Sequence, residues 1–397
     1  MILTVKRAAK TFAAVAIPAS LMIAGAAAAA ASPGGARHDS QLTVRRVLNG
    51  MKLHHTYIPS GSTKPKKEHL TFPDDLTSIG LNLFTAFQNG VGSQGQPSAD
   101  GNTDSTVVEF SLAGQEIHQW DIQGKCDGLT ADPAAGVVIA TVNEDGNSSL
   151  YTISPWSSSA AAVQHYTYNE PLPHNGGTDA ISIWGGQILI SASAPGTTGG
   201  NPAPQPTYPA VYRVSLDSST HVATVAPLFY EEATAKVANV GSMHGKKVTL
   251  GLTDPDSNEV VPSWAPRFGG QFMETSQGDK VQIFVKQSGT STALKLQVLS
   301  LSQSVDDTAW VGPGNTILYA ADTSGDTVDT VTGDFPAKAV FVAVTPCDAN
   351  NAPPTCPAPG FPPNYLGVLN PFTGHISKAH LTGPRLEPQG LMAIAPP

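Results

Sequence analysis

Short apolar runs alternate with turns rich in Gly, Asp, Asn and Pro from Thr71 almost to the C-terminus. Many of these runs are β-branched and of strand length, as at residues 106–112, 136–142, 187–192, 281–285 and 339–344. Turn-bounded runs of this kind predict β-strands. No segment keeps a helical period over several turns, and the best helical candidate, residues 231–237, is short. The pattern therefore predicts an all-β chain.

A weak internal repeat indicates how the strands are arranged. Its clearest copy opens with Cys126-Asp-Gly-Leu-Thr-Ala-Asp-Pro and continues with predicted strands at 136–142 and 149–153. The opening recurs near residues 73, 178, 269, 305 and 388. When these copies are aligned on the hydrophobic position, six residues share one column: Asp74, Asp127, Asp179, Gly270, Asp306 and Gln389. A recurrent polar-Gly-apolar opening is typical of propeller blades and is not expected of a β-sandwich.

We expect a single β-propeller of six or seven four-stranded blades over residues 71–397. The chain ends on an opening strand at 391–394, so strands from the N-terminal end, those after Thr71, should complete the last blade. Such closure protects edge strands from pairing with other chains. Residues 32–70 are interpreted as a leader or linker. The alternating Asp254, Asp256 and Asn258 are interpreted as an ordinary hairpin turn.

Residues 126–153 resemble a blade of the broad superfamily of six- and seven-bladed propellers. That superfamily includes NHL-type repeats, propellers with a Tyr-Val-Thr-Asn repeat and gluconolactonase-like lactonases. The resemblance lies in Asp127-Gly-Leu, in Asp132-Pro, in the turn at Gly136 and in the β-branched strand that follows. One blade matches well and the others match loosely. The resemblance implies a propeller fold. For the lactonases it also implies a divalent ion in a cage that usually mixes Glu, Asn and Asp.

The aligned column is the main candidate for chemistry. If each member opens an innermost strand, their side chains converge at one end of the central tunnel. Clustered carboxylates repel one another and need a cation, bound water or shifted pKa values. Hard oxygen ligands suit Ca²⁺ or another divalent cation. The candidate metal ligands are Asp74, Asp127, Asp179, Asp306 and Gln389. In the alternative interpretation, these Asp residues cap turns by accepting hydrogen bonds from backbone N–H groups.

The N-terminal residues have the layout of a secretory signal peptide. Lys6, Arg7 and Lys10 precede an apolar stretch at 11–31 that ends in alanines. We predict cleavage near Ala31, a secreted, extracellular protein and no membrane span in the mature chain. Removing three positive charges makes the chain more acidic than its formal net charge of −9. An acidic surface argues against nucleic acid as a partner, because phosphates require clustered Lys and Arg.

The chain has three cysteines. Cys347 and Cys356 bracket a short loop rich in Pro and Asn, and we predict that they form a disulfide in an oxidising compartment. The remaining thiol, Cys126, is interpreted as a small buried apolar side chain.

No catalytic residue can be named from the sequence. It contains no His-Glu-x-x-His motif, Gly-x-Ser-x-Gly elbow, phosphate loop or dinucleotide fingerprint. A propeller fold does not by itself imply a chemistry. We therefore expect a monomeric ligand- or protein-binding module that acts outside the cytoplasm on a protein, glycan or small molecule. The alternative is a divalent-metal-dependent lactonase or esterase-type hydrolase with its site at the tunnel mouth.

Overall fold

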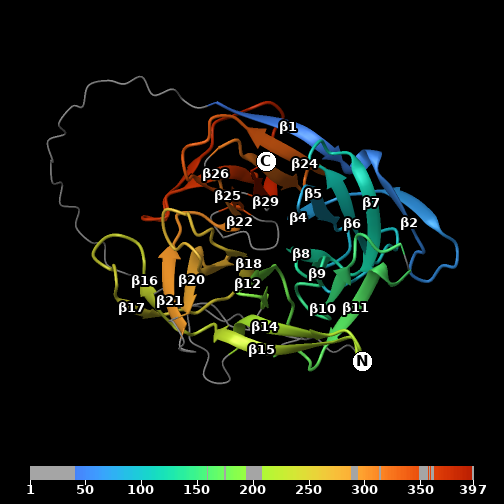
Figure 1. Cartoon of the computed structure of the whole chain (residues 1–397), viewed down its shortest axis with the longest axis horizontal. Helices are drawn as coiled ribbons and strands as arrows, with labels where there is room; N and C mark the ends of the chain where they lie inside the picture. The colour runs from blue at the N-terminus through green and yellow to red at the C-terminus, as the bar shows by residue number, and fades with distance from the viewer. Residues whose placement is uncertain are drawn as a thin grey trace, which may run out of the picture. The chain divides into compact units, whose positions relative to one another are not determined.

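Four-stranded antiparallel sheets are the repeating unit of the structure (Figure 1). The computed structural model describes residues 41–395 except for 159, 174–175, 194–207, 288–293, 313, 348–355, 357 and 359–361. The predicted signal peptide, residues 1–31, lies outside the described residues, as does the start of the predicted leader. The described residues belong to one unit, Ser40–Pro397.

The first three blades follow the chain in order. Blade 1 contains β4 (Pro73–Ile79), β5 (Asn82–Phe87), β6 (Asp104–Ser111) and β7 (Glu116–Gln123). Blade 2 contains β8 (Cys126–Asp132), β9 (Val137–Val142), β10 (Ser149–Ile153) and β11 (Val163–Tyr168). Blade 3 contains β12 (Ile181–Trp184), β13 (Gln187–Ser191), β14 (Pro209–Asp217) and β15 (Val222–Tyr230). The outer strands β11 and β15 pair in parallel, so blades 2 and 3 form one continuous sheet.

The last three blades are less regular. Blade 4 contains β18 (Pro255–Val260), β19 (Phe272–Ser276), β20 (Val281–Gln287) and β21 (Leu294–Ser300), with β16 (Thr234–Val237) and β17 (Lys247–Thr249) added outside. Blade 5 contains β22 (Val305–Trp310), β25 (Val340–Val344), β26 (Tyr365–Leu369) and β27 (Ile376–Lys378). Blade 6 contains β29 (Pro388–Ile394), β23 (Ile317–Asp322), β24 (Thr327–Thr332), β1 (Leu42–Asn49) and β28 (Leu381–Thr382).

Six innermost strands surround the central tunnel of this unit (Figure 1). They are β4, β8, β12, β18, β22 and β29. Each contacts the next, and β29 contacts β4, so the ring is closed. The described residues therefore form a six-bladed β-propeller, which confirms the predicted fold class and the resemblance on which it rested.

The strand that closes the ring is not the one predicted. Strands after Thr71 form blade 1, and β1, from the predicted leader, pairs antiparallel with β24 on the outside of blade 6. Leu42 and Val44 of β1 are buried in the core between blades 5 and 6. The propeller therefore includes residues that the sequence analysis assigned to the leader. Their apolar alternation is short and lies beside a Gly- and Pro-rich stretch, which hid it.

The strand assignments near residue 305 also need correction. The repeat placed residues 305–310 and 316–320 in one blade. In the structure, β22 belongs to blade 5, whereas β23 and β24 belong to blade 6 and β25 returns to blade 5. Blades 5 and 6 are thus interlocked, because each contains segments that flank the other in sequence. Strand periodicity marks the strands but does not specify which sheet a hairpin joins.

Apolar cores lie between neighbouring blades. Phe84 and Val107 of blade 1 pack with Leu129 and Val138 of blade 2. The predicted apolar role of Cys126 is confirmed, because its side chain is fully buried in the same cluster. The predicted disulfide is also present between Cys347 and Cys356. No helix among the described residues has the length and apolar character needed to cross a bilayer.

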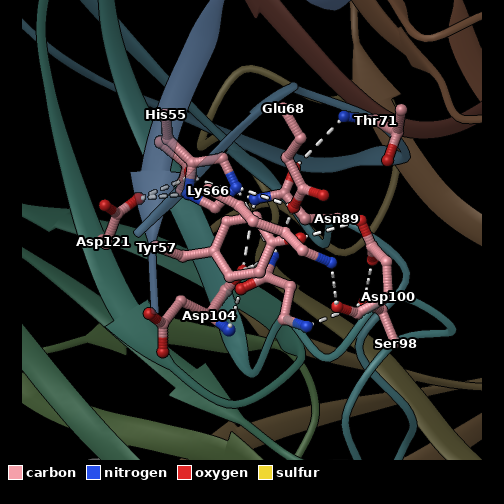
Figure 2. A network of polar contacts seen from close by, with 12 residues as sticks. His55, Tyr57, Lys66, Glu68, Thr71, Asn89, Ser98, Asp100, Asp104 and Asp121 are labelled. Carbon is pink, nitrogen blue, oxygen red and sulfur yellow. Dashed lines mark hydrogen bonds and ion pairs between the residues drawn. The ribbon is translucent and has the colours of Figure 1, made fainter. Parts of the chain in front are cut away.

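A buried histidine fixes the hairpin of β2 (His54–Tyr57) and β3 (Lys66–His69) to blade 1 (Figure 2). Nδ1 of His55 lies 3.0 Å from an oxygen of Asp121 on β7, and its Nε2 lies 2.9 Å from Glu68 on β3. The Asn102 amide also donates to Glu68. Burial disfavours the charged ring, but the hydrogen bonds to Asp121 and Glu68 outweigh it and raise the pKa of His55. A charged His55 can donate to both carboxylates at once.

We predict that the hairpin loosens as the pH rises. Because the folded-state pKa of His55 is raised, its stabilisation is present below its ordinary value of about 6.5 and is lost as the pH rises through the folded value. Amide hydrogen exchange of residues 54–69, corrected for intrinsic rates, should lose on the order of 1–2 kcal/mol of protection between about pH 6 and 8.5. His55→Gln should abolish this dependence, and replacing the exposed His380 should not. Equal protection at both pH values in the wild type would contradict the assignment.

Candidate functional site

A polar cavity of about 1170 Å³ occupies one mouth of the tunnel and is lined by all six innermost strands. Eleven acidic side chains line it, and Lys125 is the one basic side chain among the lining residues that the structure describes. No histidine belongs to that lining set. The excess of acidic over basic side chains gives the cavity a negative electrostatic potential. The low dielectric constant of the surrounding protein strengthens this potential.

Every predicted member of the metal-ligand set lines this cavity. These residues are Asp74, Asp127, Asp179, Asp306 and Gln389. Four of them are the second residue of their inner strand, and Asp179 lies two residues before β12. The structure therefore brings these five residues together, as the repeat predicted.

In blade 4, Asp256 occupies the position that the alignment gave to Gly270. Asp256 lies on the inner strand β18 and lines the cavity, whereas Gly270 lies in the turn before the second strand, β19. The segment interpreted as a hairpin turn at Asp254, Asp256 and Asn258 is thus largely an inner strand. Pro255-Asp256 repeats the Pro-polar opening of Pro73-Asp74, a signal that could have identified it. The insertion before this strand displaced the alignment.

Bulges at the strand starts explain why these side chains face the tunnel. The pairing of inner and second strands shifts register between Pro73 and Leu76, between Pro255 and Asn258, and between Val305 and Thr308. A bulge leaves a residue out of the ladder and re-aims its side chain. Aspartate is tolerated there because the residue makes no regular strand pair.

The residue after the column serves a different purpose in blades 1 and 5. Asp75 accepts a hydrogen bond from the backbone N–H of Leu129 in blade 2, at 2.7 Å. Asp307 likewise accepts from the N–H of Leu391 in blade 6, at 2.6 Å. These carboxylates join neighbouring inner strands. The backbone-capping interpretation therefore describes Asp75 and Asp307, one position after the column.

In blades 2 and 6 the residue after the column is a glycine, and its backbone lies close to that of the neighbouring blade. A Cβ on Gly128 would lie 2.4 Å from the carbonyl oxygen of Asp179, and one on Gly390 would lie 2.1 Å from that of Asp74. Both contacts join one blade to the next. The absence of a side chain here holds the inner strands, and so the column, close together.

The column carboxylates of blades 1 and 2 are already compensated within the chain. The Gln88 amide donates to Asp74 and to Asp127, each at 2.9 Å. The Lys125 ammonium lies 2.7 Å from Asp127 and also pairs with Glu144. Burial opposes the charge on Lys125, but Asp127 and Glu144 outweigh it and raise its pKa. An amide and an ammonium thus occupy the space between these carboxylates.

Blades 3 and 4 lack such compensation. Asp179 is buried, and Asp256 is partly buried. No ion pair to either one is found among the residues that the structure describes. Burial and then the charge of Asp127 raise the pKa of Asp179, and burial and then the charge of Asp179 raise the pKa of Asp256. Asp179 and Asp256 are thus neighbouring carboxylates of the mouth that repel each other when ionised and for which no ion pair is found among the described residues.

Other acidic groups of the wall are also difficult to ionise. Burial, followed by the charge of Glu144, raises the pKa of Asp127 to about 7. Burial raises the pKa of Asp307 to about 6, although Glu259 donates a hydrogen bond to it. Burial and then the charge of Asp307 raise the pKa of Glu259. At neutral pH part of the mouth is protonated, and a bound cation would displace protons from these groups into the solvent.

A metal cage is not preformed. Within the described ranges, no three His, Cys, Asp or Glu side chains are grouped so that they could hold a metal ion. The column surrounds a cavity wider than the coordination sphere of one ion, in which carboxylate oxygens lie roughly 2.3–2.6 Å from calcium. As the side chains stand, they do not fit a resident divalent ion.

Comparisons with known proteins find similarity in fold. No family model matches the chain, and no curated protein matches its sequence. The periplasmic gluconolactonase of Pseudomonas aeruginosa is 12% identical, with a TM-score of 0.43 over 90% of this chain and 99% of that chain. A chain of the nidogen/laminin complex is 8% identical, with a TM-score of 0.44 over 89% and 98%.

A third similar structure is the β-propeller domain of Swd1 from Myceliophteria thermophila. It is 12% identical, with a TM-score of 0.41 over 84% of this chain and 80% of that chain. Identities this low carry no residue role or activity from these proteins to this chain.

We predict that wild-type stability falls as the pH rises from about 4 to 7, because carboxylates with raised pKa values bind more protons in the folded state. Asp256→Asn removes one of them and should flatten this slope. It should raise the free energy of unfolding at pH 8 by about 1 kcal/mol in urea titrations. The matched control is Asp217→Asn, since hydrogen bonds from Ser219 lower the pKa of exposed Asp217 to about 2. A lower free energy of unfolding for Asp256→Asn than for the wild type at pH 8 would contradict repulsion between Asp256 and the neighbouring carboxylates.

Proposed function

We propose that this β-propeller is an extracytoplasmic binding protein that takes a positively charged small molecule into the acidic mouth of its tunnel. The observation that carries the proposal is the pair Asp179 and Asp256. They line the cavity from neighbouring inner strands, and no ion pair to either is found among the described residues. A cation between them would replace repulsion by attraction.

The shape of the site favours a small ligand over a protein surface. The acidic residues line a hollow of about 1170 Å³ instead of a flat face. Cavities of several hundred to about 1000 Å³ are typical of small-molecule sites. Several hydroxyl and amide side chains share the wall, so the ligand can be fixed by hydrogen bonds as well as by charge.

The location outside the cytoplasm is part of the proposal. It is supported by the basic residues Lys6, Arg7 and Lys10 before an apolar segment. The disulfide between Cys347 and Cys356 adds support, because such bonds persist in oxidising compartments.

The first test is titration calorimetry with spermidine, a flexible organic trication. We predict binding to the wild type that weakens with added salt. Asp179→Asn and Asp256→Asn should each weaken it by roughly ten- to a hundredfold, the value of a charge-assisted contact. Both variants should fold, since each removes a repelling charge.

The matched control is Asp217→Asn at the exposed end of β14, which should bind spermidine like the wild type. No binding by the wild type, or equal weakening by all three substitutions, would contradict a specific cation site at the mouth.

A divalent-metal-dependent lactonase or esterase-type hydrolase is the second candidate. It is favoured by one observation, that a single amide of Gln88 reaches Asp74 and Asp127 at 2.9 Å each. Two carboxylates from adjacent blades are therefore near enough to share one cation, if the amide is displaced.

The metal candidate predicts a specific thermal shift. Added Ca²⁺ should raise the melting temperature of metal-free wild-type protein by several degrees, and Asp74→Ala and Asp127→Ala should each remove most of that shift. Elemental analysis after gel filtration should then find about one ion per chain. Unchanged melting with Ca²⁺ and no bound metal would rule this candidate out, without affecting the binding of organic cations.

A further inference from the structure

Two buried serine hydroxyls in the cavity wall have no hydrogen-bond partner among the described residues. Ser182 on β12 and Ser257 on β18 are each 8% exposed and line the cavity. Neither hydroxyl makes a hydrogen bond within the part of the chain that the structure describes. Buried hydroxyls without partners are uncommon and cost free energy. A ligand that supplied the missing hydrogen bonds would recover that cost.

The two serines lie next to Asp179 and Asp256, for which no ion pair is found among the described residues. Ser182 follows Asp179 by three positions, and Ser257 directly follows Asp256. β12 and β18 are in contact. One face of the cavity therefore combines carboxylates that accept hydrogen bonds with hydroxyls that can both donate and accept. The compensated carboxylates near Lys125 lie on β4 and β8, in other blades.

The wall changes character around the ring. At the third position after the column, blades 1 to 3 carry the hydroxyl residues Thr77, Thr130 and Ser182, whereas blades 5 and 6 carry Ala309 and Met392. The edge of the cavity at blade 5 includes Trp310. At this position of the wall, blades 1 to 3 thus offer hydroxyl groups, and blades 5 and 6 offer apolar side chains.

We propose that the ligand is a polyhydroxylated amine, of the class of amino sugars, bound with its ammonium between Asp179 and Asp256 and its hydroxyls against Ser182 and Ser257. This inference rests on the cation-binding function proposed above and specifies its ligand. An ammonium group cannot accept a hydrogen bond from a serine, whereas a sugar hydroxyl or ring oxygen can. The C–H face of a sugar ring would contact the apolar side formed by Ala309, Met392 and Trp310.

Three soluble probes separate charge from hydroxyl recognition. They are the fully deacetylated glucosamine trimer, spermidine as a cation without hydroxyls, and the N-acetylglucosamine trimer as a neutral sugar. Titration calorimetry with the purified mature protein at about pH 6, where the sugar amines are charged, gives the dissociation constant of each probe. We expect the glucosamine trimer to bind at least about tenfold more tightly than either other probe.

Serine variants then test the hydroxyl contacts. Ser182→Ala and Ser257→Ala should each weaken binding of the glucosamine trimer by about five- to tenfold and leave spermidine binding unchanged. The control Ser377→Ala, on the exposed outer strand β27, should change neither. Both substitutions are small and remove unpaired hydroxyls, so folding should be preserved, which thermal melting checks.

The outcomes distinguish this inference from the proposed function. If spermidine binds as tightly as the glucosamine trimer and neither serine variant affects the trimer, the amino-sugar assignment is overturned while the cation site stands. If the neutral trimer binds as tightly as the charged one, charge is not recognised and both proposals fail. Failure of all three probes to bind the wild type would also overturn both.

Discussion

Mutual repulsion among the carboxylates at the tunnel mouth is the constraint on which the other features of the site depend. Asp74, Asp127, Asp179 and Asp256 stand at equivalent strand starts around one cavity. Closure of the ring forces them together, because each inner strand contacts the next. The fold tolerates them through raised pKa values and through the cationic and amide groups of blades 1 and 2. Asp179 and Asp256, in blades 3 and 4, have no ion pair among the described residues, so a bound cation gains the most binding free energy there.

The same strand starts also supply the contacts that hold the ring closed. Asp75 and Asp307 each accept a hydrogen bond from a backbone N–H group of the next blade. At Gly128 and Gly390, backbones approach too closely for a side chain. Neighbouring positions on one strand therefore divide two tasks, since one joins the blades and the other faces the cavity. A site built on rigid inner strands is held more firmly than one built on loops.

The repeat in the sequence was sufficient to predict the propeller and four of the five aspartates in the aligned column, because most inner strands open with the same polar-then-apolar pattern. It failed at Asp256, where an inserted hairpin displaced the alignment, and at β1, whose pairing partner is nearly 300 residues away in sequence (Val44 pairs with Val331). The exchange of β23 and β24 between blades was equally hidden, since strand patterns do not specify partners. The roles of Lys125, Gln88 and the two serines depend on side-chain contacts between blades, which no local pattern records.

Proton release on binding tests the central claim most directly. Carboxylates with raised pKa values hold protons near pH 6, and a cation that binds among them must expel some of these protons. Calorimetric titration of spermidine in buffers of different ionisation enthalpy measures that number. The account predicts that a clear fraction of a proton or more is released per ligand at about pH 6, with Asp256→Asn reducing the release. Binding at pH 6 without proton release would contradict a repelling carboxylate cluster as the binding site.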